Sequence, residues 1–340
     1  MRTRQTRLIL GATCALLAAT VRSAFPQSGI PTNDIERVGQ SGWQFLKING
    51  DPRQAGMGSA FTAIAGGDAN AVFGNPASIA DVTGSDVQFN SVLWIADITH
   101  QSFSAARSFG DIGVFALSFA TLDYGDIPET INAPIAGDTR TEAVVTGNTY
   151  TARDMALGLT YARKITENLS IGGSVRWLRE SIAELSMTNV SFDFGTLYYT
   201  GYRSLRIAMA ARNFGPDSHL IGWSEEYQAE AYDVRMPLDF RVGIAMDFFD
   251  EKGSPHVLTV ALDGDHPNDG PEKIQLGAEY MFDRTLSIRG GYKFNYDEQN
   301  FTFGAGFAYP LVGMNVKVGY AYVNFGALKQ VHMFSIGLAL

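Results

Sequence analysis

The stretch VGMNVKVGYAY, residues 312–322, alternates apolar residues with small or polar ones along its whole length. The even positions are all apolar: Val312, Met314, Val316, Val318, Tyr320 and Tyr322. The odd positions are small, polar or charged: Gly313, Asn315, Lys317, Gly319 and Ala321. A β-strand points successive side chains to opposite faces, so this period of two predicts a strand with one apolar and one polar face.

The same alternation recurs on both sides of this stretch, in residues 286–293 and 334–340. Two architectures use such strands in different ways. In a soluble sandwich the apolar face packs into the core, whereas in an outer-membrane barrel it faces lipid and the polar face lines the lumen. The choice between them decides which functions remain open.

The N-terminus predicts a secretory signal peptide over residues 1–23. Three arginines precede a nearly unbroken apolar run, residues 8–21, which is shorter than the roughly 20 residues of a membrane-spanning helix. The only cysteine, Cys14, lies inside this run. We therefore expect a mature chain without disulfides or cysteine metal sites. Residues 24–41, which contain Pro26 and Pro31, are predicted to be a linker.

The charge balance excludes one class of partner. The full chain has 26 basic and 35 acidic residues, and without the four arginines of the signal the basic count falls to 22, a net charge of −13. An acidic chain is unsuited to nucleic acid, so we expect none. Beyond the signal, no run of 18 apolar residues predicts a helical membrane span. The 36 glycines and 12% aromatic residues favour a barrel over an average globular domain.

Alternation and turn signals predict fourteen strands of 9 to 14 residues. They cover residues 86–95, 100–109, 112–122, 151–164, 168–180, 188–200, 202–213, 236–249, 255–263, 271–282, 285–296, 299–309, 311–323 and 331–340. A tilted strand that crosses a bilayer needs about 9–11 residues, which is longer than most strands of soluble proteins. The lengths therefore favour a membrane barrel.

The positions of the long connections support the same choice. Residues 123–150, 214–235 and 264–270 follow the third, seventh and ninth predicted strands, whereas the connections after even-numbered strands are mostly tight. In an up-and-down barrel this parity gathers long loops at one rim and short turns at the other. A sandwich with crossing connections has no reason to show it.

The two faces of the predicted barrel can be named. Lipid-facing rows are predicted at Leu238, Phe240, Val242, Ile244, Met246 and Phe248, and at Phe301, Phe303, Phe307 and Tyr309. The opposite face carries Arg176, Asp193, Arg206, Arg212, Asp239, Arg241, Asp247, Glu279, Arg289, Lys293 and Lys317. Mixed charges are tolerated in a wet lumen or against a polar plug.

Residues 42–85 precede the barrel, which is predicted to span residues 86–340. The run at residues 45–48 resembles a short strand, and the rest is rich in glycine and other small residues. A segment of about 40 such residues has too little apolar surface to fold alone. We therefore predict that it packs inside the barrel as a hatch.

Three pieces of this segment follow one another in order: the run at residues 45–48, the glycine-rich piece with Arg53, Gly56, Met57 and Gly58, and the triplet Asn75, Pro76 and Ala77. Together they resemble the start of the PorV/PorQ family of outer-membrane proteins, which are relatives of FadL-type long-chain fatty-acid transporters. The resemblance implies an all-β, 14-stranded antiparallel transmembrane β-barrel with an N-terminal hatch in the lumen.

For PorV the resemblance implies a role in type IX secretion, as a scaffold that binds the translocon and the C-terminal domains of secreted cargo. The alternative is a FadL-like transporter of hydrophobic small molecules. Both place the mature chain in the bacterial outer membrane, in contact with its lipid. Whether a lipid or detergent molecule also binds in the lumen is left open by the sequence.

Candidate recognition residues lie in the two longest connections, because exposed aromatic and apolar side chains commonly anchor protein interfaces. They are Tyr124, Ile127 and Ile131 in the first, and Trp223, Tyr227 and Tyr232 in the second. At the level of sequence the charged lumen favours protein recognition over hydrophobic transport, since charged walls forfeit the gain from burying apolar groups.

Catalytic, cofactor and metal sites are not predicted, and we expect no enzyme activity. The five histidines lack partners at metal-ligand spacing. An acidic cluster could hold Ca²⁺ but lacks the order of a calcium-binding loop, and a solvated acidic loop is the favoured interpretation. It consists of Asp263, Asp265, Asp269 and Glu272.

Overall fold

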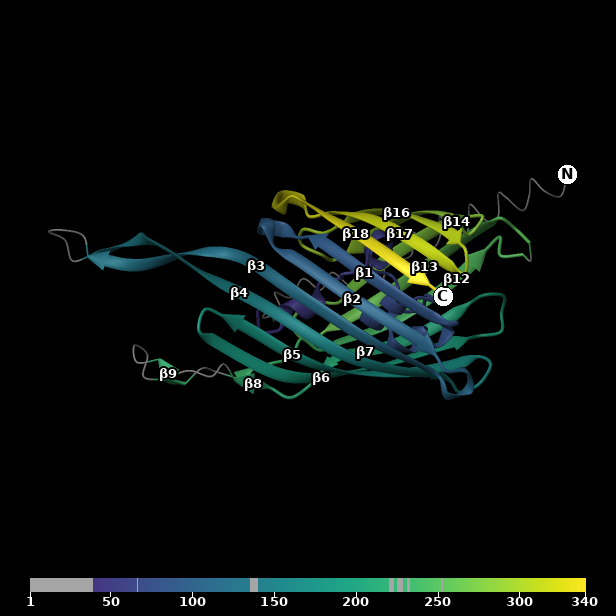
Figure 1. Cartoon of the computed structure of the whole chain (residues 1–340), viewed down its shortest axis with the longest axis horizontal. Helices are drawn as coiled ribbons and strands as arrows, with labels where there is room; N and C mark the ends of the chain where they lie inside the picture. Colours follow the sequence, from purple (N-terminus) through teal and green to yellow (C-terminus); the bar gives the residue numbers. More distant parts are fainter. Residues whose placement is uncertain are drawn as a thin grey trace, which may run out of the picture. The chain divides into compact units, whose positions relative to one another are not determined.

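The computed structural model describes residues 39–340 except 66, 135–139, 220–222, 225–228, 231–232 and 252. Fourteen strands close into one antiparallel barrel, in which sequence neighbours pair and the first strand also pairs with the last (Figure 1). They are β1 (Ser85–Leu93), β2 (Thr99–Ser108), β3 (Val114–Pro134), β4 (Thr141–Lys164), β5 (Leu169–Ile182), β6 (Leu185–Tyr199), β7 (Arg206–Phe214), β12 (Asp239–Phe248), β13 (His256–Pro267), β14 (Lys273–Phe282), β15 (Leu286–Phe294), β16 (Phe301–Leu311), β17 (Met314–Asn324) and β18 (Gln330–Ala339). The prediction of a 14-stranded β-barrel is confirmed.

The period-two pattern places the side chains as the sequence predicts. Along β12, Phe240 and Ile244 are each 43% exposed on the outer wall, whereas Asp239 faces inward and is 5% exposed. Phe303 on β16 is 58% exposed on the same outer wall. An exposed belt of large apolar side chains around a closed barrel is what a membrane barrel presents to lipid. Among the described residues, no helix is both long enough and apolar enough to cross a membrane.

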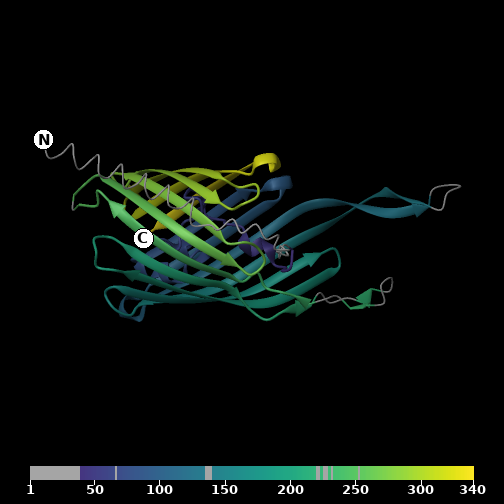
Figure 2. The ribbon, with the colours of Figure 1, turned by 180° about the vertical axis from the view of Figure 1, so that it is seen from behind.

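The first long connection is not a loop. Residues 124–134 of β3 and 141–151 of β4 continue past the barrel as a two-stranded ribbon (Figures 1 and 2). Two register shifts interrupt the pairing, and Gly125 and Gly147 lie there with φ of +70° and +90°. Bulges of this kind break the alternation of apolar and polar residues, so the sequence pattern predicts a connection here and not two strands. We call these residues the ribbon.

The second long connection contains four two-residue strands, paired two by two. They are β8 (Ser218–His219), β9 (Trp223–Ser224), β10 (Ala229–Glu230) and β11 (Asp233–Val234). This connection joins β7 to β12 at the ribbon-bearing rim. The C-terminal Leu340 lies at the opposite rim, where its N–H donates to the Ser85 carbonyl at 2.7 Å.

The stretch that indicates the fold begins in a turn. Val312 is 97% exposed and Gly313 has a φ of +77°, so β17 begins only at Met314. The prediction of a strand from residue 311 is therefore wrong by three residues, because alternation does not distinguish a tight turn from the strand that follows it.

Residues 43–82, the internal segment, contact the inward faces of strands on all sides of the barrel and are mostly buried. Their helical turns are η1 (Gln44–Lys47), α2 (Pro52–Gly56), η2 (Ala69–Phe73) and η3 (Pro76–Asp81). The prediction of a strand at residues 45–48 is wrong, because a closed barrel leaves no free edge inside for that run to pair with. The predicted signal peptide and most of the predicted linker lie outside the described residues.

Candidate functional site

Glycines on the barrel wall let the internal segment approach the backbone directly. A Cβ on Gly277 would lie 2.2 Å from the Met57 carbonyl oxygen, and one on Gly291 would lie 2.1 Å from the nitrogen of Gly58. Side chains at these wall positions would clash, so the wall is shaped to the segment that it encloses. Gly58 itself has a φ of +68°, a conformation that glycine adopts at little cost.

The predicted piece from Arg53 to Gly58 forms α2 and the turn after it. Asp51 caps α2, since its carboxylate accepts a hydrogen bond from the Arg53 N–H at 3.0 Å, and Pro52 occupies the first helical position. Gly56 packs against β16, where a Cβ would lie 3.1 Å from Gly304 Cα. The cap therefore fixes a short helix whose far side is pressed onto the wall.

Asn75 joins the internal segment to the other side of the barrel. Its Oδ1 caps η3 by accepting from the Ala77 N–H at 3.0 Å, and its Nδ2 donates to the carbonyls of Thr62 (2.8 Å) and Thr196 (3.0 Å). The side chain is fully buried. Pro76 and Ala77 follow it against β5, where a Cβ on Gly172 would lie 2.5 Å from the carbonyl carbon of Pro76. Asparagine before proline is a common start of a helical turn, whereas the link from Asn75 to the wall leaves no mark in the local sequence.

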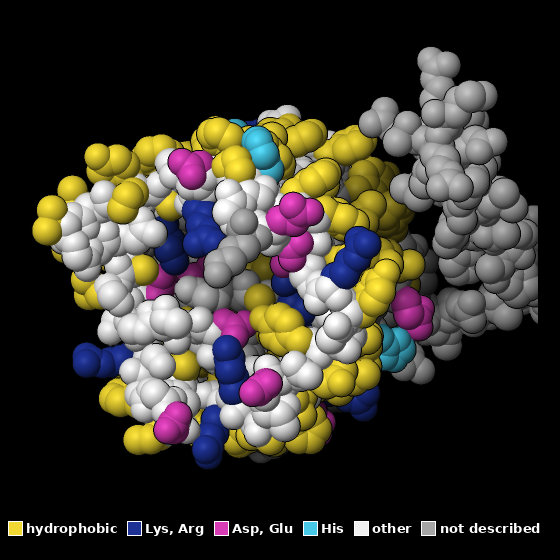
Figure 3. Space-filling view, turned by 90° about the vertical axis from the view of Figure 1, so that its right-hand side faces the viewer, with side chains coloured by type: hydrophobic (Ala, Val, Ile, Leu, Met, Phe, Trp, Pro, Cys, Tyr) yellow, Lys and Arg dark blue, Asp and Glu magenta, His cyan; other side chains and the backbone are white. Residues whose placement is uncertain are grey.

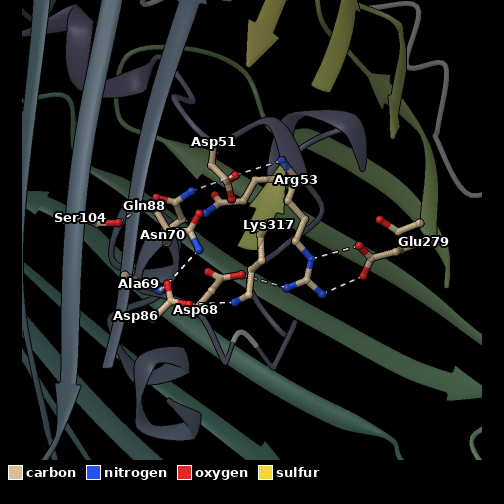
Figure 4. A network of polar contacts seen from close by, with 12 residues as sticks. Asp51, Arg53, Asp68, Ala69, Asn70, Asp86, Gln88, Ser104, Glu279 and Lys317 are labelled. Atoms are coloured by element: carbon tan, nitrogen blue, oxygen red, sulfur yellow. Dashed lines mark hydrogen bonds and ion pairs between the residues drawn. The ribbon is translucent and has the colours of Figure 1, made fainter. Parts of the chain in front are cut away.

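Arg53 lies at the centre of an ionic network (Figure 4). Its Nη2 is 2.7 Å from Glu279 Oε2 on β14, and its Nη1 is 3.2 Å from Asp68 Oδ2. Glu279 also accepts from Arg289 Nε on β15 at 2.7 Å and is 1% exposed. A buried carboxylate between two guanidinium groups is charge-compensated, so the network ties α2 to the wall without an isolated buried charge.

The same network continues to β1 and β17. The Asp86 carboxylate accepts from the Ala69 N–H at 2.9 Å and from Lys317 Nζ at 2.8 Å. Asn70 exchanges amide hydrogen bonds with Asn90, 3.0 Å each way. These contacts fix η2 against the seam where β1 meets β18.

Two further groups of polar contacts hold the middle of the segment. The Asp263 carboxylate on β13 accepts from the N–H groups of Phe61 and Thr62 at 2.8 Å each. Arg206 pairs with Asp247 at 2.6 Å and donates from Nε to the carbonyl of residue 63 at 3.2 Å. The charged residues predicted to line a wet lumen therefore lie inside, where several of them contact the internal segment.

The internal segment begins at the ribbon-bearing rim. The Gly42 N–H donates to the Arg235 carbonyl at 3.0 Å. Asp269, in the loop after β13, accepts from Lys47, Ser41 and Gln44. Burial opposes ionisation of Asp269, but these three hydrogen bonds outweigh it and hold the pKa of the carboxyl below its usual value.

The segment ends at the opposite rim. There Asp81 accepts from the Tyr199 hydroxyl at 2.9 Å and pairs with Lys164 at 2.7 Å. Basic and acidic side chains are interspersed across this end of the barrel (Figure 3). The internal segment therefore runs from one rim to the other before it leads into β1.

An apolar cluster occupies the ribbon-side half of the lumen. Its buried members are Trp43, Phe45, Leu46, Leu122, Ala156, Leu178, Met187 and Met236. Trp43 is 1% exposed, and its Nε1 donates to Ser218 Oγ at 3.0 Å. We call this group the apolar cluster.

A cavity of about 30 Å³, room for about one water molecule, lies beside this cluster. His100 Nδ1 and Arg176 Nε are buried near it without a hydrogen-bond partner among the described residues. A larger groove of about 640 Å³ lies on the outer wall, lined by residues of β2 to β4 such as Gln101, Phe119 and Arg153. Neither cavity is an open path along the lumen.

The structure separates the predicted recognition residues. Tyr124 is not exposed in a loop: it packs against the apolar cluster, and its hydroxyl donates to Asp154 Oδ2 at 2.8 Å. Ile127 and Ile131 lie on the ribbon, where Ile131 is 53% exposed. Trp223 is part of β9, while Tyr227 and Tyr232 lie outside the described residues.

The acidic residues weighed as a calcium site do not gather in one place. Asp263 binds the backbone of the internal segment, whereas Asp269 binds Lys47 at the rim. Glu272 is 3.2 Å from the exposed His266. Within the part of the chain that the structure describes, no group of three or more His, Cys, Asp or Glu side chains could hold a metal ion.

Comparisons with known proteins give a fold but no close relative. No family model matches the sequence, and no curated protein matches it. Among solved structures, the CymD monoaromatic hydrocarbon channel is similar with a TM-score of 0.53 and 13% identity, over 84% of this chain and 95% of that one. The Pseudomonas putida toluene transporter TodX is similar with a TM-score of 0.54 and 10% identity, over 86% of this chain and 97% of that one. The chain therefore shares the barrel fold of these two proteins, and at these identities the likeness concerns the fold alone.

Proposed function

We propose that this protein is an outer-membrane channel for small hydrophobic molecules, closed by its internal segment. The observation that carries the proposal is the apolar cluster, which lies beneath the ribbon-bearing rim in a barrel with the fold of CymD and TodX. The remaining cavity of about 30 Å³ is too small for a hydrocarbon, so binding requires the internal segment to move. The outer belt of apolar side chains supports a place in the membrane.

From the sequence alone, the charged lumen argues against a channel for hydrophobic molecules. In the structure this objection is weaker, because several of the charges are paired. Glu279 and Asp247, for example, are neutralised by ion pairs, and Asp263 accepts two backbone hydrogen bonds. The apolar cluster presents a separate surface on which each buried CH₂ of a ligand is worth about 0.8 kcal/mol. Phe45 and Leu46 of η1 form part of that surface, so displacing η1 would expose it to a ligand.

The fluorescence of Trp43 tests ligand binding directly. We expect toluene, titrated into the purified protein in lipid nanodiscs, to shift Trp43 emission saturably, because the indole lies in the apolar cluster. Trp43→Phe should remove the saturable change. Trp177→Phe is the matched control, since Trp177 is 42% exposed on the outer wall and reports only partitioning into lipid.

Transport is tested separately with radiolabelled toluene and proteoliposomes that enclose a trapping enzyme. The proposal expects faster accumulation than in protein-free liposomes, and faster still when the internal segment is loosened. A signal that follows Trp177 alone, together with uptake equal to that of protein-free liposomes, would contradict the channel.

A second candidate is the protein scaffold of type IX secretion that the resemblance implies. One observation favours it: the ribbon projects beyond the barrel with Val145 61% and Ile131 53% exposed. Cross-linking from a photoreactive residue at position 131 in native outer membranes should then capture translocon components or cargo C-terminal domains. Capture of neither would leave the channel as the only candidate.

A further inference from the structure

Among the residues that the structure describes, neither edge of the ribbon has a strand partner, because the neighbouring barrel strands end below it. On β3 the pairing with β2 stops at Asp123, which is opposite Thr99. On β4 the pairing with β5 stops at Ala152, opposite Ile182, and the turn after β5 closes against it through the Ala183 N–H, which donates to the Thr151 carbonyl at 3.0 Å. No described strand therefore pairs with the outer edge of β4 from residue 150 to residue 141.

The two edges are not equivalent. The ribbon part of β3 contains Pro128 and Pro134, which have no N–H to donate, and prolines commonly block an exposed strand edge. Residues 141–150 of β4 read TEAVVTGNTY and contain no proline. Threonine and valine favour the extended conformation, and Glu142 is the single charged residue in this run. The β4 edge thus keeps every backbone N–H donor. Its regularly paired part is residues 141–145, and the bulge that contains Gly147 separates this part from residues 149–150.

The free β4 edge is also held in strand geometry without support from the barrel. Residues 141–149 are all exposed, so neither face of β4 packs on another part of the described chain. Across the ribbon, Glu129 accepts from Thr146 Oγ1 at 2.6 Å and from Asn148 Nδ2 at 2.9 Å. An isolated two-stranded ribbon is marginal in water, so a third strand would stabilise it.

We propose that the edge of β4 at residues 141–150 binds an extended, basic segment of another polypeptide as an added β-strand. The added strand continues the line of β5 above its turn. The charges near this edge are mostly acidic. Glu142 lies on the edge strand itself, Asp126 and Glu129 lie on the paired strand β3, and Glu184 lies in the turn after β5, against Arg140 and Arg153, of which Arg153 pairs with Asp123. The same charges repel a second ribbon, so charge complementarity favours a basic partner over another copy of this chain. The proposal stands independently of the channel.

The experiment uses the full chain in nanodiscs and two dye-labelled ten-residue probes. One probe alternates lysine with valine, and its matched control alternates glutamate with valine. We expect saturable binding of the lysine probe in fluorescence anisotropy, with slower amide hydrogen exchange at residues 141–150 and unchanged exchange at residues 126–134. Glu142→Lys should weaken binding about tenfold, while Glu167→Lys, exposed at the opposite rim, should not.

A second variant separates binding from folding. Replacement of residues 127–149 by a short Asn-Gly turn should abolish binding and leave the heat-modifiable barrel intact. The proposal is overturned if the lysine probe does not bind, if both probes bind equally, or if the shortened chain still binds. It is equally overturned if protection appears on the β3 edge, or if the chain dimerises through the ribbon in place of binding the probe.

Discussion

Arg53 of the internal segment and Glu279 of β14 form a bidentate ion pair inside the barrel. Nη2 and Oε2 are 2.7 Å apart, and Nε and Oε1 are 3.1 Å apart. The two residues are 226 positions apart in the sequence. The pair therefore connects the segment to the wall at a point that depends on the register of the whole barrel.

Replacing Arg53 should loosen the internal segment without unfolding the barrel. Arg53→Met leaves the 1% exposed Glu279 with Arg289 alone, and breaking a buried ion pair costs about 3–5 kcal/mol. We expect larger and more frequent conductance steps in planar bilayers, with normal heat-modifiability. Arg163→Met, exposed on the outer wall, is the control. Unchanged conductance would show that Arg53 does not help to hold the internal segment in the barrel.

A methyl group on the wall should act in the same direction. In Gly277→Ala the added Cβ would lie 2.2 Å from the Met57 carbonyl oxygen, and overpacking of this kind costs about 1–3 kcal/mol. Gly290→Ala on β15 is a close control, because nothing lies within 4 Å of its added Cβ. Protease cleavage within the internal segment should accelerate in the first variant only. Equal cleavage of both would show that the segment is not pressed against this wall.

Asn75 offers a test from the other side of the lumen. Asn75→Leu removes the cap of η3 and the hydrogen bonds to the carbonyls of Thr62 and Thr196, leaving buried polar groups unpaired at about 1–3 kcal/mol. We expect a loosened segment and a normal barrel, measured by conductance and heat-modifiability. Asn132→Leu, exposed on the ribbon, should change neither. If Asn75→Leu also changes neither, its structural role must be abandoned.

The rim contact of Asp269 should respond to acid. Its carboxyl has a pKa below the ordinary 3.8 in the folded state, so its hydrogen bonds with Lys47, Ser41 and Gln44 are complete above that value. They are lost as the pH falls through the lowered pKa. Amide exchange at residues 42–48 should therefore accelerate only below about pH 4. In Asp269→Asn it should be fast at every pH, and persistence of the acid step there would assign it to another group.

Orientation in the membrane can be tested with single cysteines, since the only native one, Cys14, lies in the predicted signal. Thr149→Cys on the ribbon should react with an impermeant maleimide on intact cells. Glu251→Cys, at the opposite rim, should react only after the outer membrane is permeabilised. Labelling of residue 251 on intact cells, with residue 149 protected, would show that the ribbon-bearing rim faces the periplasm.

The strands could be predicted because lipid and lumen demand opposite side chains at alternate positions, as Phe240 and Asp239 illustrate. The ribbon could not, because both of its faces are exposed and Gly125 and Gly147 break the register. The Arg53–Glu279 pair could not be predicted either, because it depends on the register of strands far from Arg53 in the sequence and no local sequence pattern marks it. One signal was present: glycines such as Gly277 on the polar face mark where another backbone approaches.

The route of the internal segment also constrains how the chain can assemble. The segment leads directly into β1, and β1 closes on β18 through pairs such as Asp86 with Ala339, the ladder of greatest sequence separation in the barrel. Loop closure makes such a pairing slow, so this seam is expected to form late. Contacts of the segment with β14 and β15 involve shorter separations and can form on an open sheet. The sheet thus wraps around its own N-terminal segment, and sealing the seam traps that segment within the wall.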